Sequence, residues 1–257
     1  MKVFHIITSI DYGGSQNILF NICKKDLDNE HLVISLKKLD TYRDTHNVKV
    51  YSFNTNLFNF PFVIFKILNL IFYFNPNVIQ SWLYHADFIT IFMKPFLPKR
   101  KIIWNIRSTN LSLNKNFFTI IVRTINSLFS YIVPNKIIFC SNESLDIHKK
   151  YLFNKNIFYL IHNGVDLDYY KILNKNNNSD CINIGCNARY HPMKDHLTLF
   201  KALSLLKKKN IIFKLHLIGE GINDINFKQL DFFEDIIIYK LGSDTNDFFN
   251  QIDLHIL

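Results

Sequence analysis

Residues 182–196 read INIGCNARYHPMKDH, and this stretch decides the predicted fold more than any other. An apolar run leads into a polar turn, and leucines then recur at helical spacing as far as Lys209, which predicts a strand, a turn and a helix. The turn carries Arg189 and Lys194 just beyond the strand's carboxyl end, the edge at which open α/β sheets bind ligands. A planar guanidinium and a compact ammonium placed there suit a diphosphate.

The same alternation of strand and helix patterns runs outward from this stretch through most of the chain. Helical spacing of apolar residues is clearest at Phe62–Phe74 and Phe117–Tyr131. The predicted strands are Val3–Thr8, His31–Leu36, Val48–Phe53, Val78–Trp82, Lys101–Arg107, Lys136–Ser141, Ile157–Ile161 and the run from Phe213 to a glycine turn at Gly219–Gly221. Strands that alternate with helices predict parallel sheets covered by helices on both faces, so the fold class is α/β.

A polar, low-complexity run at 174–180 interrupts this alternation. We interpret it as a linker between two α/β domains, with residues 1–173 before it and 181–257 after it. The second domain is short for a doubly wound domain. The last residues, 251–257, have the pattern of a buried strand, so a chain that stops there is expected to be incomplete.

Composition limits the classes of partner. The 257 residues carry a formal net charge of +9, which favours anionic partners such as nucleotide phosphates or an acidic membrane surface. Nucleic acid is the least favoured of these, because the charges are dispersed and no nucleic-acid-binding motif is present. The four cysteines form no CxxC pair, so core thiols in a reduced, cytoplasmic protein are expected rather than a metal site: Cys23, Cys140, Cys181 and Cys186.

Two apolar windows, Leu57–Phe74 and Phe117–Val133, are interrupted by polar residues and fall short of a membrane span. Two core helices are the favoured interpretation. The alternative is an interfacial surface that rests on the inner leaflet, with Lys66 and the basic run 99–101 on anionic headgroups.

Several motifs, taken in order along the chain, resemble glycosyltransferase family 4. Gly13-Gly14 matches the family's glycine turn after the first strand. QSWLYHAD at 80–87 and WNIRSTN at 104–110 resemble the subgroup that builds bacterial O-antigen, capsule and lipopolysaccharide-type glycans. HNGVD at 162–166 is similar to a family turn in which proline is usual at the first position, and Ala188 to His196 matches the donor-phosphate motif.

The resemblance implies a GT-B fold: two Rossmann-like domains facing a cleft, of which the second is incomplete here. It implies a retaining enzyme that moves a sugar from a nucleotide-diphosphate donor to a lipid-linked or cell-surface glycan, with no metal or other cofactor. Arg189 and Lys194 would hold the diphosphate and stabilise the leaving group. Gly13 and Gly14 would let backbone approach the donor phosphates.

The remaining site residues are also carried over from the resemblance. His85 would act at the transferred sugar, Arg107 and Asn110 would line the acceptor side, and Gly219 would contribute to donor binding near the base. Each has a structural alternative: a helix-capping histidine for His85, an ion pair in the core for Arg107, and ordinary turns for the glycines.

One departure from the family limits these expectations. The family's glycine-rich loop and its pair of glutamates seven residues apart do not occur in these 257 residues. The second hypothesis is therefore a truncated, catalytically inactive nucleotide-binding remnant or scaffold of the same fold. A glycoside hydrolase is disfavoured, because no acidic pair has the setting that its chemistry needs.

Overall fold

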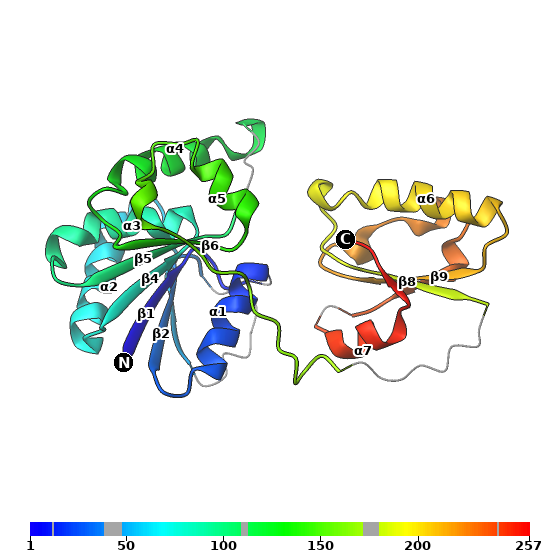
Figure 1. Cartoon of the computed structure of the whole chain (residues 1–257), viewed down its shortest axis with the longest axis horizontal. Helices are drawn as coiled ribbons and strands as arrows, with labels where there is room; N and C mark the ends of the chain where they lie inside the picture. Colours follow the sequence, from blue (N-terminus) through cyan, green and yellow to red (C-terminus); the bar gives the residue numbers. More distant parts are fainter. Residues whose placement is uncertain (12, 39–47, 109–112, 172–179, 241) are drawn as a thin grey trace. The chain divides into compact units, whose positions relative to one another are not determined.

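The structure is a computed structural model that describes residues 1–11, 13–38, 48–108, 113–171, 180–240 and 242–257. Contacts divide the chain into two compact units, Met1–Gly164 and Val165–Leu257 (Figure 1). Each unit is a parallel α/β sheet with helices on both faces, which confirms the predicted fold class.

The division between the units falls at Gly164, ahead of Leu173, where the sequence placed the end of the first domain. Residues 165–171 lie with the second unit because two tyrosines attach them there. The Tyr169 hydroxyl donates to the Asp244 carboxylate, and the ring of Tyr170 packs edge-on against Phe249. The predicted linker lies almost wholly outside the described residues.

The first unit is built on a seven-stranded sheet in the order β3-β2-β1-β4-β5-β6-β7. Its strands are β1 Lys2–Ile7, β2 Glu30–Ser35, β3 Lys49–Ser52, β4 Val78–Trp82, β5 Lys101–Ile106, β6 Lys136–Phe139 and β7 Phe158–Leu160. Its helices are α1 Gly14–Lys25, α2 Phe60–Phe74, α3 Tyr84–Met93, α4 Leu113–Phe129 and α5 Asn142–His148, with short 3₁₀ turns η1 Lys94–Phe96 and η2 Lys155–Ile157. The order reverses between β1 and β4, the switch point at which ligands bind in open sheets.

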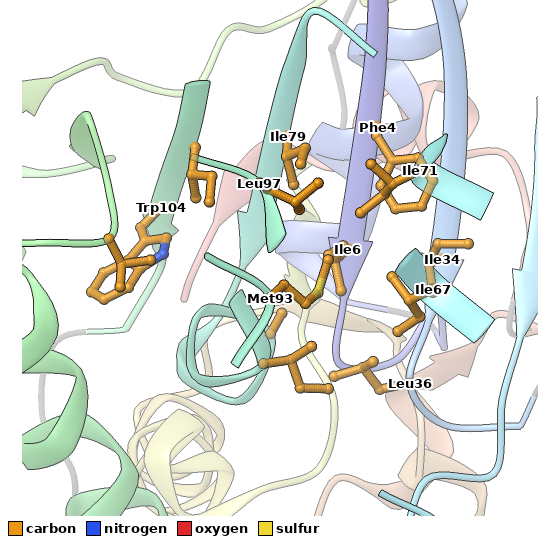
Figure 2. Close-up of a cluster of buried hydrophobic side chains, with 14 of the residues drawn as sticks. Phe4, Ile6, Ile34, Leu36, Ile67, Ile71, Ile79, Met93, Leu97 and Trp104 are labelled. Atoms are coloured by element: carbon orange, nitrogen blue, oxygen red, sulfur yellow. The ribbon is translucent and has the colours of Figure 1, made fainter. Parts of the chain in front are cut away.

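The larger core of this unit lies between the sheet and the helices α2 and α3 (Figure 2). Phe4 and Ile6 project from β1 into this layer and meet Ile67, Ile71 and their neighbours from α2. Alternate residues of the strands point to the opposite face, where α1 covers a second cluster around Leu19, Phe20 and Trp82. Successive side chains of β1 point to opposite faces of the sheet, so this one strand contributes residues to both hydrophobic clusters.

Helix α2 illustrates how local sequence sets an element's bounds. Pro61 occupies the first turn, where its missing N–H costs nothing, and Val63, Ile67 and Ile71 repeat at a spacing of four to form the buried stripe. Asn75 ends the helix in the left-handed conformation. Within the described residues, no helix is long and apolar enough to cross a membrane.

The second unit has a four-stranded sheet in the order β10-β9-β8-β11. Its elements are β8 Ile182–Asn187, η3 Pro192–Lys194, α6 His196–Lys208, β9 Phe213–Ile218, η4 Ile222–Asp224, η5 Phe227–Gln229, η6 Phe233–Asp235, β10 Ile236–Ile238, α7 Thr245–Gln251 and β11 Leu254–His255. Helix α6 packs over Ile184, Leu215 and Leu217, whereas Phe248 of α7 packs with Ile218.

The predicted burial of the last strand is wrong. Residues 251–257 do contain a strand, β11, but Leu254 is 50% exposed and His255 is exposed as well. The reason is its place in the sheet, because β11 pairs with β8 at one end of the described strand order. An apolar sequence pattern does not distinguish a central strand from one at an edge.

Candidate functional site

The turn after β8 has the predicted strand–turn–helix form and presents two cations to solvent. Arg189 follows the strand, Lys194 ends the η3 turn, and both side chains are exposed. Two backbone hydrogen bonds tie the turn to the loop after β9: Ala188 N–H donates to Ile218 O at 3.0 Å, and Tyr190 N–H donates to Glu220 O at 2.7 Å. The backbone that carries Arg189 is thus fixed while its side chain remains available to a ligand.

Gly219 is the residue that permits this close approach of two loops. A Cβ atom at position 219 would lie 2.1 Å from the carbonyl oxygen of Ala188 and 2.9 Å from the nitrogen of Arg189. Both neighbours are backbone atoms, so a side chain could be accommodated only by moving the turn. The sequence predicted a donor-binding role for Gly219, and the contact that the structure provides is with the peptide unit just before Arg189.

The groups around Lys194 are mostly structural. Asp195, with a φ of 46°, caps α6 by accepting a hydrogen bond from the Thr198 amide. His196 is buried with its Nε2 atom 3.8 Å from the Cys186 sulfur, and burial lowers the pKa of this histidine. A neutral, enclosed imidazole is a packing group, so the adjacent Asp and His do not form an acid–base pair open to a substrate.

In the first unit, the predicted His85 lies at the start of α3, directly after the carboxyl end of β4. The turn that delivers it contains Leu83 in an unusual conformation, with φ 72° and ψ 154°, held by a hydrogen bond from its amide to Asn105 O at 3.1 Å. His85 is half-buried, and burial, with a smaller contribution from Lys37, lowers its pKa. A strained turn at a strand end is typical of functional sites and supports the prediction without testing it.

Arg107 follows the neighbouring strand, β5, and pairs with no carboxylate among the described residues. Its guanidinium carbon lies 4.8 Å from the centre of the Trp82 ring, and Nη1 donates to the Asn163 side chain. Burial lowers the pKa of Arg107. Trp82 and Asn163 are contacts that sequence reasoning missed, although both lay in motifs that it had selected. Asn110, the other predicted acceptor-side residue, lies outside the described residues.

Gly13 and Gly14 lie at the N-terminus of α1, also beyond the carboxyl end of β1. Gly13 is the N-cap and Gly14 the first helical residue; among the described residues no side chain caps the helix, and its first turn contains no acid. A Cβ atom at Gly13 would meet only the flexible end of Gln16, and at Gly14 it would meet open space. The fold therefore tolerates small side chains at both positions.

A buried chain of polar groups crosses the α1 face of the sheet. The Trp82 indole donates to His5 Nδ1 at 3.3 Å, His5 Nε2 lies 3.0 Å from His31 Nδ1, and His31 Nε2 lies 3.2 Å from an Asp26 oxygen. An indole only donates, so this order fixes the tautomers of the two neutral rings: each imidazole accepts at Nδ1 and carries its proton on Nε2. Sequence reasoning missed the chain, because its members come from four separate segments.

His5, His31 and Cys23 are residue types that can bind a metal ion. One potential ligand atom of each lies within 4.8 Å of the other two, and no other such group occurs among the described residues. Hydrogen bonds already engage both ring nitrogens of His5, and coordination through His5 Nε2 would oppose two N–H donors at Trp82. We therefore interpret the group as structural. A surface cavity of about 660 Å³ adjoins His31 and Cys23. It lies at the amino end of the strands, whereas the predicted site residues lie at the carboxyl end, and Lys2 and Glu30 are part of its lining.

The predicted residues thus fall on two sheet edges. The first unit gathers Gly13, Gly14, His85 and Arg107 at the carboxyl edge of its sheet, and the second gathers Arg189, Lys194 and Gly219 at the carboxyl edge of the other. The edge of the first unit carries the neutral His85 and the Arg107 guanidinium, which lies over the Trp82 ring. The edge of the second unit carries two exposed cations, Arg189 and Lys194, on a turn held by backbone hydrogen bonds. The second arrangement is suited to an anion.

Comparison with known proteins identifies the architecture. No protein-family model matches the chain, and no curated protein matches it significantly. Solved structures do. HepE from Anabaena, solved in complex with UDP and glucose, superposes with a TM-score of 0.79 at 17% identity, covering 99% of this chain and 73% of that one.

Two further solved structures show the breadth of the likeness. A glycosyltransferase from Rickettsia africae gives a TM-score of 0.69 at 18% identity, covering 99% of this chain and 72% of that one. UDP-N-acetylglucosamine 2-epimerase from Rickettsia bellii gives 0.54 at 13%, covering 97% and 71%. Together with the two parallel sheets, these matches show that the chain has the GT-B fold, which glycosyltransferases share with other proteins that handle nucleotide sugars.

Proposed function

We propose that this chain acts as a retaining glycosyltransferase that moves a sugar from a nucleotide-diphosphate donor to a lipid-linked or cell-surface glycan in the cytoplasm. The observation that carries the proposal is the exposed Arg189–Lys194 turn at the carboxyl end of β8, in a chain whose fold matches that of HepE. HepE was solved with UDP and with UDP-glucose. Membership of family 4 and a role in O-antigen, capsule or lipopolysaccharide synthesis rest on the motif resemblance.

In this proposal the second unit supplies the electrostatics. Arg189 would engage the diphosphate as a two-pronged donor and Lys194 as a point charge, both offsetting the negative charge that develops on the leaving nucleotide. Lys194 stands beside a capped helix rather than in an ion pair, since no salt bridge of Lys194 occurs among the described side chains. The two cations would do the work for which other sites recruit a metal.

The first unit would supply the sugar and acceptor contacts. His85 is neutral at physiological pH because burial lowers its pKa, so it would donate or accept hydrogen bonds at sugar hydroxyls without adding charge. Arg107, backed by Trp82, would orient the acceptor, and Asn110 keeps the acceptor-side role that the motif resemblance implies. Gly219 would act indirectly, through the backbone that carries Arg189.

Calorimetric titration with UDP, GDP and their sugar conjugates tests the donor assignment directly. We expect Arg189→Ala and Lys194→Ala each to weaken binding by about tenfold or more, because each removes a hydrogen bond to a charged group. Lys201→Ala, which removes an exposed cation from α6 away from the turn, is the matched control and should bind normally. Unchanged affinity in both turn variants would refute the phosphate assignment.

Turnover separates the transferase from its alternatives. Release of the sugar, or its transfer to a lipid-linked acceptor, would support the enzyme, and the two turn variants should then lose most of the rate. Nucleotide binding without release or transfer would favour the inactive remnant or scaffold of the same fold. Interconversion of two free nucleotide sugars would instead point to the chemistry named for the Rickettsia bellii neighbour.

A further inference from the structure

The outer face of α2 is unusual for a helix on the surface of a folded unit. Phe62, Phe65, Phe72 and Tyr73 all point away from the core and are 58%, 59%, 57% and 89% exposed, respectively. They recur at helical spacing, on the side opposite the buried stripe of Val63, Ile67 and Ile71. The helix is therefore apolar on both sides, and only one side has a partner within this chain.

The exposed aromatic side chains continue beyond α2. Helix α3 packs between α2 and α4, so the three helices form one layer over the same side of the sheet (Figure 1). Phe96, which follows α3, is 61% exposed, and Phe118 of α4 is 78% exposed. We use the term aromatic face for this surface, defined by Phe62, Phe65, Phe72, Tyr73, Phe96 and Phe118.

Charge on this part of the chain has one sign. Between residues 48 and 142 the only carboxylate is Asp87, which is fully buried and accepts a hydrogen bond from Ser81. The same span contains ten basic residues: Lys49, Lys66, Lys94, Lys99, Arg100, Lys101, Arg107, Lys115, Arg123 and Lys136. No acidic group is therefore exposed beside the aromatic face within the helices that form it.

Basic side chains stand directly beside the aromatic ones. The Lys66 ammonium lies 4.4 Å from the centre of the Phe62 ring. Arg100 donates to the Pro76 carbonyl oxygen at 2.6 Å, which places the basic run 99–101 next to the end of α2. Such long cationic side chains can reach headgroup phosphates while the neighbouring rings enter the apolar boundary.

We infer that the aromatic face docks on an anionic lipid bilayer, with α2 lying in the plane of the interface. A bilayer matches two observed properties together: exposed aromatic side chains on α2, the η1 turn and α4, and a chain segment, residues 48–142, whose exposed charged side chains are all basic. This inference concerns membrane binding alone and does not rest on the proposed transfer reaction.

Vesicle flotation with the full chain tests the inference. Vesicles of phosphatidylcholine mixed with phosphatidylglycerol should bind the protein, and vesicles of phosphatidylcholine alone should bind it much less. Phe62→Ser combined with Phe65→Ser should weaken binding at least about tenfold, because each ring loses its apolar burial. Lys66→Gln with Lys99→Gln should weaken binding to the anionic vesicles by roughly fivefold per lysine.

A matched control comes from the second unit. Leu197 and Leu205 on α6 are 60% and 59% exposed, so their double change to serine removes two apolar side chains of the same fractional exposure from another place. This control should float as the wild type does, and circular dichroism should show all variants folded. Equal binding of the aromatic-face and control variants, or no flotation with either lipid, would overturn the inference. A dimer in solution that the Phe62 and Phe65 changes abolish, without vesicle binding, would assign the face to a second copy instead.

Discussion

Gly219→Ala is the most informative single change, because it adds one methyl group where two backbone segments touch. The new Cβ atom would lie 2.1 Å from the Ala188 carbonyl oxygen, more than 1 Å inside an ordinary van der Waals contact. The loops must separate, and the hydrogen bonds from the amides of Ala188 and Tyr190 hold them together at 3.0 Å and 2.7 Å. Overpacking costs about 1–3 kcal/mol and each of the two weakened hydrogen bonds about 0.5–1.5 kcal/mol, so we expect a loss of about 2–6 kcal/mol.

Scanning calorimetry of the full chain measures this loss. About 4–8 °C of melting temperature corresponds to 1 kcal/mol in a unit of this size, so the transition of the second unit should fall by at least about 8 °C. Nucleotide affinity, measured well below that transition, should fall as well, because the turn that carries Arg189 must move. Gly164→Ala is the control, since a Cβ atom there would meet no atom within 4 Å.

Two results would refute this reasoning. A Gly219→Ala protein that melts within about a degree of wild type would mean that the two loops are not in contact as described. A protein that is destabilised as expected yet binds nucleotide normally would separate Gly219 from the donor site, leaving it a purely structural glycine.

The remaining predictions concern how the stability of the first unit depends on pH through its buried titratable side chains. Burial lowers the pKa of His5 to about 3 and of His148 to about 4, so both rings stay neutral in the folded chain while they protonate in the unfolded chain below pH 6.5. The free energy of unfolding, measured by urea titration, should therefore fall between pH 6.5 and pH 4, by about 3 kcal/mol for each ring, and His148→Gln should flatten that slope. A slope that is unchanged in this variant would contradict the assignment. Burial raises the pKa of Asp87 well above its ordinary value, so its contribution to stability is complete at low pH and is lost as pH rises. Asp87→Asn should match wild type near pH 4 and be more stable than wild type at pH 8, and a destabilised variant at pH 8 would show that the carboxylate is stabilised by partners other than Ser81.

The fold was predictable from sequence where short-range patterns determine it. Apolar period and local end signals are sufficient for a helix such as Phe60–Phe74, whose start at Pro61 and end at Asn75 have chemical markers. The short helix Thr245–Gln251 was not predicted, because seven residues with one fully buried side chain, Phe248, give no readable period. The exposure of Leu254 depends on which strand pairs beside it, and a single segment carries no such information.

The candidate site was predictable to a different extent. The strand–turn–helix that presents Arg189 and Lys194 follows from one continuous stretch, and the structure contains it. The contact of Gly219 with Ala188 arises from the pairing of Asn187 with Ile218, which is a property of two strands in register. The hydrogen-bonded chain through His5 likewise needs the topology before it can be seen. The roles assigned to these residues remain predictions until binding is measured.

The central place of β1 has a consequence for how the first unit is made on the ribosome. This strand is synthesised before both of its neighbours, which are β2 on one side and β4 on the other, and Val3 pairs with Val78. Closing a loop of that length must precede the pairing, so one whole edge of a largely buried, apolar strand waits without its partner during synthesis. The nascent chain passes through a stage with an open sheet edge, and this interval is when it most needs protection from aggregation.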